Sequence, residues 1–252
     1  MKLFGLIGRQ LQHSCSVELF SEIFTLEGIK ETAYSLYPLR DVSEFQALLI
    51  NTPGLLGLNV TVPFKKTIMP LLDDISPLAK SIGAVNVIAV RREEEIPHCK
   101  GYNTDVWGFK HALRPLLGSH HRKALILGSG GAAAAARHVL RELNIESLIV
   151  SRKKKADTIS FDEIAPGIMA SHLLIIQATP LGMFPETHSC PPIPYQFITP
   201  EHLLFDMVYN PAETLFMQKG AAMGAMVCNG MEMLRLQAQR SWQIWKSSLS
   251  SV

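Results

Sequence analysis

The chain has 252 residues, of which 47% are hydrophobic and 18% charged, with 24 lysines and arginines against 22 aspartates and glutamates. This apolar content is enough for packed cores in one large or two modest domains, and it excludes a disordered chain. The charge is nearly balanced and no long basic stripe is interleaved with aromatic residues, which argues against a nucleic-acid partner.

The sequence predicts neither a membrane segment nor a metal centre. No apolar run approaches the roughly 20 residues of a membrane span, and the apolar run at residues 1–9 is too short for a signal peptide. The four cysteines are scattered without C-x-x-C spacing, which is typical of reduced thiols. Histidines in metal-ligand spacing are absent from the sequence. We therefore expect a cytoplasmic protein without a metal and without membrane contact.

The chain begins with a predicted strand, Lys2–Ile7, and a helical pattern follows from Val17 until Gly28 ends it. Two serines precede this helix. Ser16 as a helix N-cap is the locally favoured interpretation. The alternative is that the hydroxyls of Ser14 and Ser16 bind a carboxylate beside the helix N-terminus.

The pattern then predicts a strand, a short helix and another strand: Thr32–Tyr37, Phe45–Leu49 and Leu55–Thr61. Pro63 disfavours continuation of the last strand, so the chain leaves the sheet there. Asn59, Thr61 and Lys65 would then lie at the C-terminal end of a strand, where open α/β sheets place ligands. The alternative for Lys65 is an ordinary surface lysine at a helix start.

Ser76-Pro77 predicts a capped helix start, and Ala84–Val90 and His98–Asn103 predict two paired strands. Asn86 is either a satisfied core amide or a side chain that faces a pocket. Thr104 is predicted to cap a helix whose first turn contains Asp105. The helix dipole alone favours a carboxylate there, so that residue needs no functional explanation at this point.

The segment Lys123–Lys155 predicts a strand, a glycine turn, a helix and a second strand, which is one βαβ crossover. Gly128 permits the tight turn, Gly130 lets the main chain approach a pyrophosphate, and the helix N-terminus presents free N–H groups to the anion. Ala133 stands at the third position of the G-x-G-x-x-G/A pattern.

The residues after the second of these strands indicate which dinucleotide binds. An NAD site usually has a carboxylate about 20 residues beyond the glycines. Here Ser151 and Arg152 are followed by lysines from Lys153 onward. A cluster of cations suits a 2′-phosphate, so the sequence predicts NADP. The alternative is a solvated charge run after a buried strand.

The remaining segments continue the alternation of strand and helix. A weak helical connector is predicted over Asp157–Ile164, and strands over Leu173–Ile176 and Leu203–Val208. A helix over Glu213–Ala222, a short strand over Ala225–Cys228 and a last helix from Gly230 onward follow. The predicted fold is therefore α/β, with two α/β domains and a cleft between them, the second domain Rossmann-like.

At this point several short strings resemble the shikimate dehydrogenase family over nearly the whole chain. They stand at residues 5–8, 13–16, 59–65, 83–86, 101–105, 128–131, 178–183, 206–209 and 233–237. Each string is weak by itself, but their order and spacing together are specific. The resemblance implies a substrate-binding and catalytic domain in residues 1–106 and an NADP-binding domain in residues 107–229, with the helix of residues 230–252 packing back toward the first.

The resemblance also implies roles for particular residues. Lys65 and Asp105 would form the catalytic pair. The substrate would be bound by Ser14, Ser16, Thr61, Asn86, Asp105, Tyr209 and Gln237. The cofactor would be bound by Gly128, Ser129, Gly130, Gly131, Ala132, Ser151, Arg152, Lys153, Met207 and Gly230. Glu232 stands where the family commonly has glycine, close to the expected nicotinamide site.

The implied reaction is the reversible NADPH-dependent reduction of 3-dehydroshikimate to shikimate, in aromatic amino acid biosynthesis, by a monomer or homodimer. Two alternatives stay open. One is a quinate/shikimate dehydrogenase with relaxed choice of substrate or cofactor. The other is a non-catalytic sensor of a nucleotide or small acid, which would have no need of Lys65 and Asp105.

Overall fold

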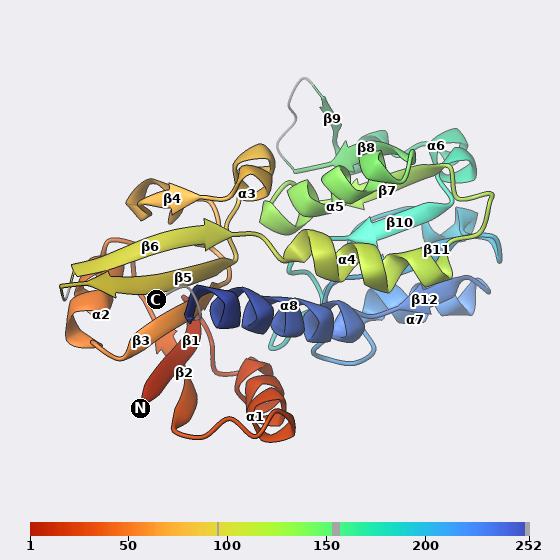
Figure 1. Cartoon of the computed structure of the whole chain (residues 1–252). Coiled ribbons are helices and arrows are strands. Elements are labelled where there is room, and N and C mark those ends of the chain that lie inside the picture. Colours follow the sequence, from red (N-terminus) through yellow and green to blue (C-terminus); the bar gives the residue numbers. More distant parts are fainter. Residues whose placement is uncertain (95, 153–156, 250–252) are drawn as a thin grey trace. The chain divides into compact units, whose positions relative to one another are not determined.

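The computed structural model describes residues 1–94, 96–152 and 157–249 (Figure 1). The chain divides into two compact units, Met1–Trp107 with Gln237–Val252 and Gly108–Leu236. It passes from the first unit to the second within α4 (Asp105–Leu113) and returns within α8 (Met231–Leu249). Among the described residues, no helix combines the length and apolar character needed to cross a membrane.

The first unit contains a mixed six-stranded sheet in the order β2-β1-β3-β5-β6-β4. In that order the strands are Thr32–Pro38, Lys2–Gly8, Leu55–Val60, Val87–Glu93, Ile96–Tyr102 and Asp74–Ile75. β1 pairs in parallel with both β2 and β3, since α1 (Ser16–Leu26) and α2 (Glu44–Asn51) return the chain to the same edge. β5 is antiparallel to β3 and to β6. The pairing of β5 with β6 was predicted from the sequence, whereas the antiparallel pairing of β5 with β3 was not.

Apolar side chains fill both faces of this sheet. One face carries a cluster that includes Phe45, Phe64 and Ile68, and α2 contributes to it. The opposite face packs on α1 and α8, where Trp242 and Trp245 contact Phe4. Such double coverage buries most of β1 and β3 and the first half of β5, which fixes the strand ends where the site residues lie.

Trp245 anchors α8 to the sheet. Its side chain is fully buried and its indole N–H donates to the Ile88 carbonyl at 2.9 Å. Gly57 faces this ring, and a Cβ at that position would overlap the indole. The glycine therefore makes room for the largest side chain of the core.

The second unit contains a parallel six-stranded sheet in the order β12-β11-β10-β7-β8-β9. In that order the strands are Met226–Cys228, Leu203–Asp206, Leu174–Gln177, Lys123–Leu127, Glu146–Val150 and Thr158–Ile159. β10 and β11 are buried at every position. Buried parallel strands have near-continuous apolar sequences, which matches Leu174-Ile175-Ile176 here.

The remaining described elements are helices and 3-10 segments. The helices not yet named are α3, α5, α6 and α7, at Pro77–Ile82, Gly131–Glu142, Pro166–Ser171 and Leu215–Ala222. In the part of the chain that the structure describes, the 3-10 segments η1 to η4 occupy Met69–Leu71, Arg114–Leu116, Phe161–Glu163 and Tyr195–Phe197.

These observations confirm the predicted α/β class with two units, the second Rossmann-like. The predicted helix stop at Gly28 is confirmed by its φ of 65°, and the Ser76 cap by a bond from the Ala79 N–H at 3.4 Å. The helical connector predicted over Asp157–Ile164 is wrong. There the short strand β9 pairs with β8 and is followed by η3.

Candidate active site

Several predicted site residues of the first unit lie at one edge of its sheet. β1 and β3 are parallel and end together, with Ile7 paired to Val60. β5 starts beside that end, since Asn59 pairs with Val87, and β6 finishes there, since Val87 pairs with Tyr102. The segments that leave or enter the sheet at this edge carry Ser14, Ser16, Thr61, Lys65, Asn86 and Asp105.

Lys65 and Asp105 form an ion pair within this unit. The Lys65 Nζ lies 2.7 Å from the Asp105 Oδ2. The Asp105 side chain is only 1% exposed, whereas that of Lys65 is 18% exposed. The pair therefore combines a buried carboxylate with a lysine side chain that is partly exposed. A cation in that position is available to a ligand outside while its counter-charge stays fixed.

Asn86 holds the other side of the carboxylate. Its Nδ2 donates to the Asp105 Oδ1 at 2.9 Å and to the Thr104 hydroxyl at 3.1 Å, and its Oδ1 accepts from the Thr104 N–H at 2.7 Å. Asn86 is buried, with 4% of its surface exposed. These bonds satisfy the buried amide of Asn86 and orient Asp105, and the contact of Asn86 with a substrate stays a prediction.

The start of α4 is held by Asn103. The Asn103 Oδ1 accepts the Val106 N–H at 3.2 Å, and its Nδ2 donates to the Ala84 carbonyl at 3.0 Å. The prediction that the Thr104 side chain caps this helix is wrong, because that hydroxyl bonds to Asn86 instead. Asn103 therefore fixes the helix end from which Asp105 projects.

Ser14 and Ser16 are joined at the start of α1. The Ser14 hydroxyl donates to the Ser16 hydroxyl at 2.9 Å, and the Ser16 N–H donates to the Ser14 Oγ at 3.2 Å. Ser16 is the first residue of α1, and no side chain caps this helix. The locally favoured interpretation of Ser16 as the cap is therefore wrong. The two hydroxyls lie together, as carboxylate binding requires.

Thr61 follows β3 and donates its N–H to the Ile7 carbonyl at 2.9 Å. Gln237 lies in α8, half-buried, and its carbonyl accepts the Ser241 hydroxyl at 2.8 Å. Ser241 is completely buried and also accepts from the Asn59 Nδ2 at 3.0 Å. Sequence reasoning did not identify Ser241, because a serine among Gln239, Arg240 and Gln243 has no signal that separates it from a surface residue.

The glycine turn lies in the second unit, between β7 and α5. Gly128 has a φ of 119°, and a Cβ there would lie 2.9 Å from the Ala178 carbonyl oxygen. A Cβ on Gly130 would meet no atom within 4 Å, so open space adjoins the main chain before α5 begins at Gly131. A bare turn with free space at the N-terminus of a twelve-residue helix suits a pyrophosphate.

The residues after β8 lie next to this turn. The Ser151 hydroxyl is 3.3 Å from that of Ser129, and Ser151 is buried. Arg152 follows and is exposed, and neither of these two residues is a carboxylate. Lys153 lies outside the described residues. The arrangement has the cation that a 2′-phosphate needs and lacks the acid that would favour a 2′-hydroxyl.

Met207 and Gly230 lie against each other in the second unit. The Gly230 N–H donates to the Val208 carbonyl at 3.0 Å, and a Cβ on Gly230 would overlap the Met207 carbonyl. Tyr209 belongs to the same unit, so its role beside a substrate stays a prediction. Glu232 is exposed in the first turn of α8, and nothing in the structure explains its presence there.

Asp206 supports this region from the end of β11. Its carboxyl is completely buried and accepts the Thr214 hydroxyl at 2.6 Å and the Val208 N–H at 2.9 Å. Burial raises the pKa of Asp206 from 3.8 to about 6, and these two hydrogen bonds oppose the shift. Asp206 therefore holds its neighbours Thr214 and Val208 by hydrogen bonds, and it takes up a proton at a higher pH than an exposed aspartate does.

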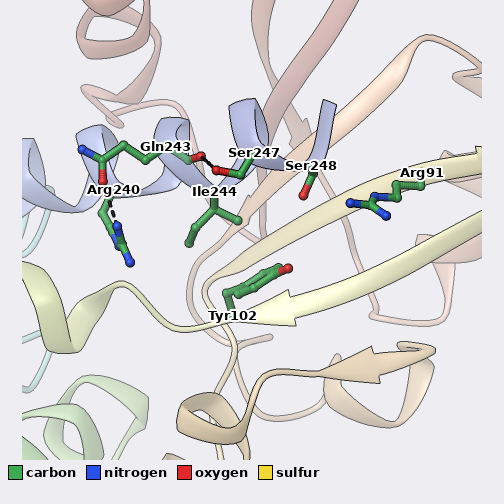
Figure 2. Close-up of a pocket in the computed structure, with 7 residues that line it drawn as sticks. All are labelled: Arg91, Tyr102, Arg240, Gln243, Ile244, Ser247 and Ser248. Carbon is green, nitrogen blue, oxygen red and sulfur yellow. Dashed lines mark hydrogen bonds between the residues drawn. The ribbon is translucent and has the colours of Figure 1, made fainter. Parts of the chain in front are cut away.

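A separate cavity of about 260 Å³ lies in the first unit between α8 and the β5–β6 pair (Figure 2). Arg91 and Tyr102 line it from the strands, and Arg240 and Gln243 from the helix. The Arg240 guanidinium donates to the Gln243 Oε1 at 2.9 Å and lies 5.1 Å from the centroid of a Trp107 ring. The residues that line this cavity are not among the predicted site residues.

Comparisons with known proteins identify the family. Residues 6–88 match the shikimate dehydrogenase substrate binding domain. The NADP(+) shikimate dehydrogenase of Clostridium beijerinckii is 36% identical over 257 residues, which cover 98% of this chain and 92% of that protein.

Two solved structures extend the likeness. The structure of shikimate dehydrogenase 1 from Peptoclostridium difficile superposes with a TM-score of 0.87 at 35% identity, and covers 98% of this chain and 92% of that one. Shikimate 5-dehydrogenase from Thermus thermophilus, solved in complex with NADP(H) and shikimate, gives 0.85 at 26% identity, with 98% and 94% covered. The chain belongs to the shikimate dehydrogenase family.

Proposed function

We propose that this protein is an NADP-dependent shikimate dehydrogenase, an oxidoreductase that reversibly reduces 3-dehydroshikimate to shikimate on the pathway to aromatic amino acids. The observation that carries the proposal is the Lys65–Asp105 ion pair at 2.7 Å, held by Asn86 at the sheet edge, in a member of this family. The unit Met1–Trp107 with Gln237–Val252 would bind the substrate, and the unit Gly108–Leu236 the cofactor.

The residues of the second unit fit NADP. The open main chain at Gly130 admits the pyrophosphate, and Arg152, with Lys153 by sequence, offers positive charge to the 2′-phosphate. Gly128, Ser129, Gly131, Ala132 and Ser151 complete the proposed cradle. Met207 and Gly230 are proposed to lie near the nicotinamide. When bound, NADPH supplies the hydride that reaches the ketone carbon.

Lys65 is the proposed donor and acceptor of the proton. As the ketone is reduced, negative charge develops on its oxygen, and the ammonium stabilises that charge and donates a proton to it. In the reverse direction the neutral amine accepts the hydroxyl proton. Asp105 keeps the ammonium in place and accepts a hydrogen bond from a neighbouring substrate hydroxyl. Because the carboxylate is buried and bonded to Asn86, it does not have to reorganise as charge moves.

The remaining polar residues orient the substrate. Ser14 and Ser16 would bind its carboxylate with their paired hydroxyls, and Thr61, Gln237 and Tyr209 would surround the ring and its hydroxyls. Lys65, the more exposed member of the pair, would meet the reacting oxygen, and Asp105 would meet the neighbouring hydroxyl.

The test is oxidation of shikimate by the purified protein, followed by the absorbance of reduced nicotinamide. Shikimate with NADP should give steady turnover. Replacing shikimate with quinate, or NADP with NAD, one at a time, measures how strictly the enzyme selects its substrate and its cofactor. Binding of NADP without oxidation of shikimate would refute the proposed activity and favour a sensor.

Two further properties belong to this proposal. The four cysteines, none of which forms a disulfide, fit a cytoplasmic enzyme. A monomer or homodimer is proposed as the assembly, to be measured by light scattering.

A further inference from the structure

Ser241 joins the part of α8 that belongs to the first unit to the sheet of that unit. The hydroxyl donates to the Gln237 carbonyl at 2.8 Å and accepts from the Asn59 Nδ2 at 3.0 Å. It also lies 3.5 Å from the Thr104 hydroxyl. A serine hydroxyl has one proton to donate and can accept two bonds, so these three contacts use its full capacity. Ser241 is completely buried.

Asn59, the partner on β3, is itself held in place. Its Oδ1 accepts the Tyr34 hydroxyl at 2.8 Å, and the strand ends one residue later at Val60. The chain that continues from that end carries Thr61 and Lys65. A bond to Asn59 therefore fixes the point from which the proposed catalytic lysine departs.

Through Thr104 the same network reaches the ion pair. The Thr104 hydroxyl accepts from Asn86, and Asn86 donates to Asp105, which binds Lys65. Polar contacts thus run without a break from α8 to the ammonium. In a buried setting, a fully satisfied network of this kind selects one arrangement of its members.

The hydroxyl is not needed to dock the helix. Trp242 and Trp245 already bury their rings against the sheet. Bonds from a serine to the carbonyl four residues earlier are also ordinary, since Ser247 makes one to Gln243 at 3.0 Å on the same helix (Figure 2). What distinguishes Ser241 is the additional bond to a strand, which sets the rotation and height of the turn that carries Gln237.

We propose that Ser241 is a positioning residue, which fixes the Gln237 turn of α8 against the end of β3 and thereby the bound substrate against Lys65. This inference rests on the proposed function, in which Gln237 binds the substrate and Lys65 handles the proton. Ser241 itself touches neither substrate nor cofactor.

Ser241→Ala removes the hydroxyl and leaves the Asn59 Nδ2 with only the Asn86 carbonyl, at 3.4 Å, as its acceptor among the bonds described. We expect kcat/KM for shikimate to fall about tenfold, the usual effect of an unmade buried hydrogen bond on a well-placed group. The dissociation constant of NADP should not change, because the glycine turn belongs to the other unit. The matched control is Ser247→Ala, which removes an exposed hydroxyl with the same bond to the preceding turn.

A double-mutant cycle separates positioning from general structure. If Ser241 acts through Gln237, Ser241→Ala should have little further effect on kcat/KM in a Gln237→Ala protein. Additive losses, or wild-type kcat/KM in Ser241→Ala, would overturn the inference. Thermal unfolding and NADP binding verify that each variant is folded. Wild-type protein that fails to oxidise shikimate would instead refute the proposed function, so the two failures are distinguishable.

Discussion

Replacing Lys65 with alanine tests the proposed proton chemistry and also disturbs a buried charge. In the wild type, the Lys65 Nζ lies 2.7 Å from the Asp105 Oδ2. The substitution removes the ammonium and leaves a carboxylate that is 1% exposed with Asn86 as its partner. Two losses are therefore expected, one in turnover and one in stability, and they have different causes.

The expected loss in turnover is about 10²–10⁴-fold, the range that a positioned acid–base group contributes. Removing one member of a buried ion pair destabilises a protein by about 3–5 kcal/mol. Since Lys65 is 18% exposed and Asn86 still bonds to the carboxylate, we expect the lower end of that range. The second substitution Asp105→Asn should restore stability, because an amide needs no counter-ion, but it should not restore activity.

The assay is steady-state oxidation of shikimate with NADP, alongside urea unfolding of each variant. The matched control is Lys66→Ala, which removes the neighbouring exposed lysine. It should retain wild-type turnover. Unchanged turnover in Lys65→Ala, or an equal loss in Lys66→Ala, would refute the assigned role. Recovery of turnover in Lys65→Ala/Asp105→Asn would mean that the loss came from the unpaired charge.

Three other predictions follow from the second unit. The folded-state pKa of Asp206 is raised from 3.8 to about 6, so the free energy of unfolding should decrease as pH rises between these values. At about 1.36 kcal/mol per pKa unit, the decrease is about 3 kcal/mol. Asp206→Asn should flatten that part of a pH–stability profile, and an unchanged slope would mean that another group causes the pH dependence. Gly128→Ala should destabilise the fold by more than about 1 kcal/mol, since its φ of 119° and the Ala178 carbonyl at 2.9 Å both oppose a Cβ. Gly167→Ala, where a Cβ meets nothing within 4 Å, is the control in the same denaturant titration. Arg152→Gln should raise KM for NADP about tenfold to a hundredfold with little change for NAD, from the lost charge-assisted bond; equal changes for both cofactors would contradict 2′-phosphate binding.

Much of the fold could be predicted because its signals are local. Buried runs such as Leu174–Ile176 indicate strands by themselves, and Ser76-Pro77 marks a helix start through the chemistry of two adjacent residues. The direction of β5 relative to β3 has no such signal, because an antiparallel pair and a parallel pair bury the same apolar residues. The Asp157–Ile164 segment was mistaken for a helix, since a two-residue strand such as β9 is defined by its partner β8 rather than by its own periodicity.

The candidate site shows the same division. The roles of Lys65, Asp105 and the glycine turn were predicted from motifs and stay predictions, while the local interpretations of Ser16 and Thr104 as caps failed. A hydroxyl bonds to whatever the tertiary structure brings near it, and this cannot be seen in the neighbouring residues. Ser241 is the extreme example, because its partner Asn59 is 182 positions away in the sequence.

The return of α8 to the first unit has a consequence for biosynthesis. Trp245, the largest completely buried side chain, is translated about 190 residues after Gly57, which it covers. A nascent chain leaving the ribosome therefore exposes the part of the Phe4 face that α8 covers until that helix emerges, whereas α1 and all strands of the inserted unit are made earlier. The unit whose synthesis begins first is therefore the last to complete its core. Chaperones can bind its uncovered apolar face for longer than they can bind the strands of the inserted unit.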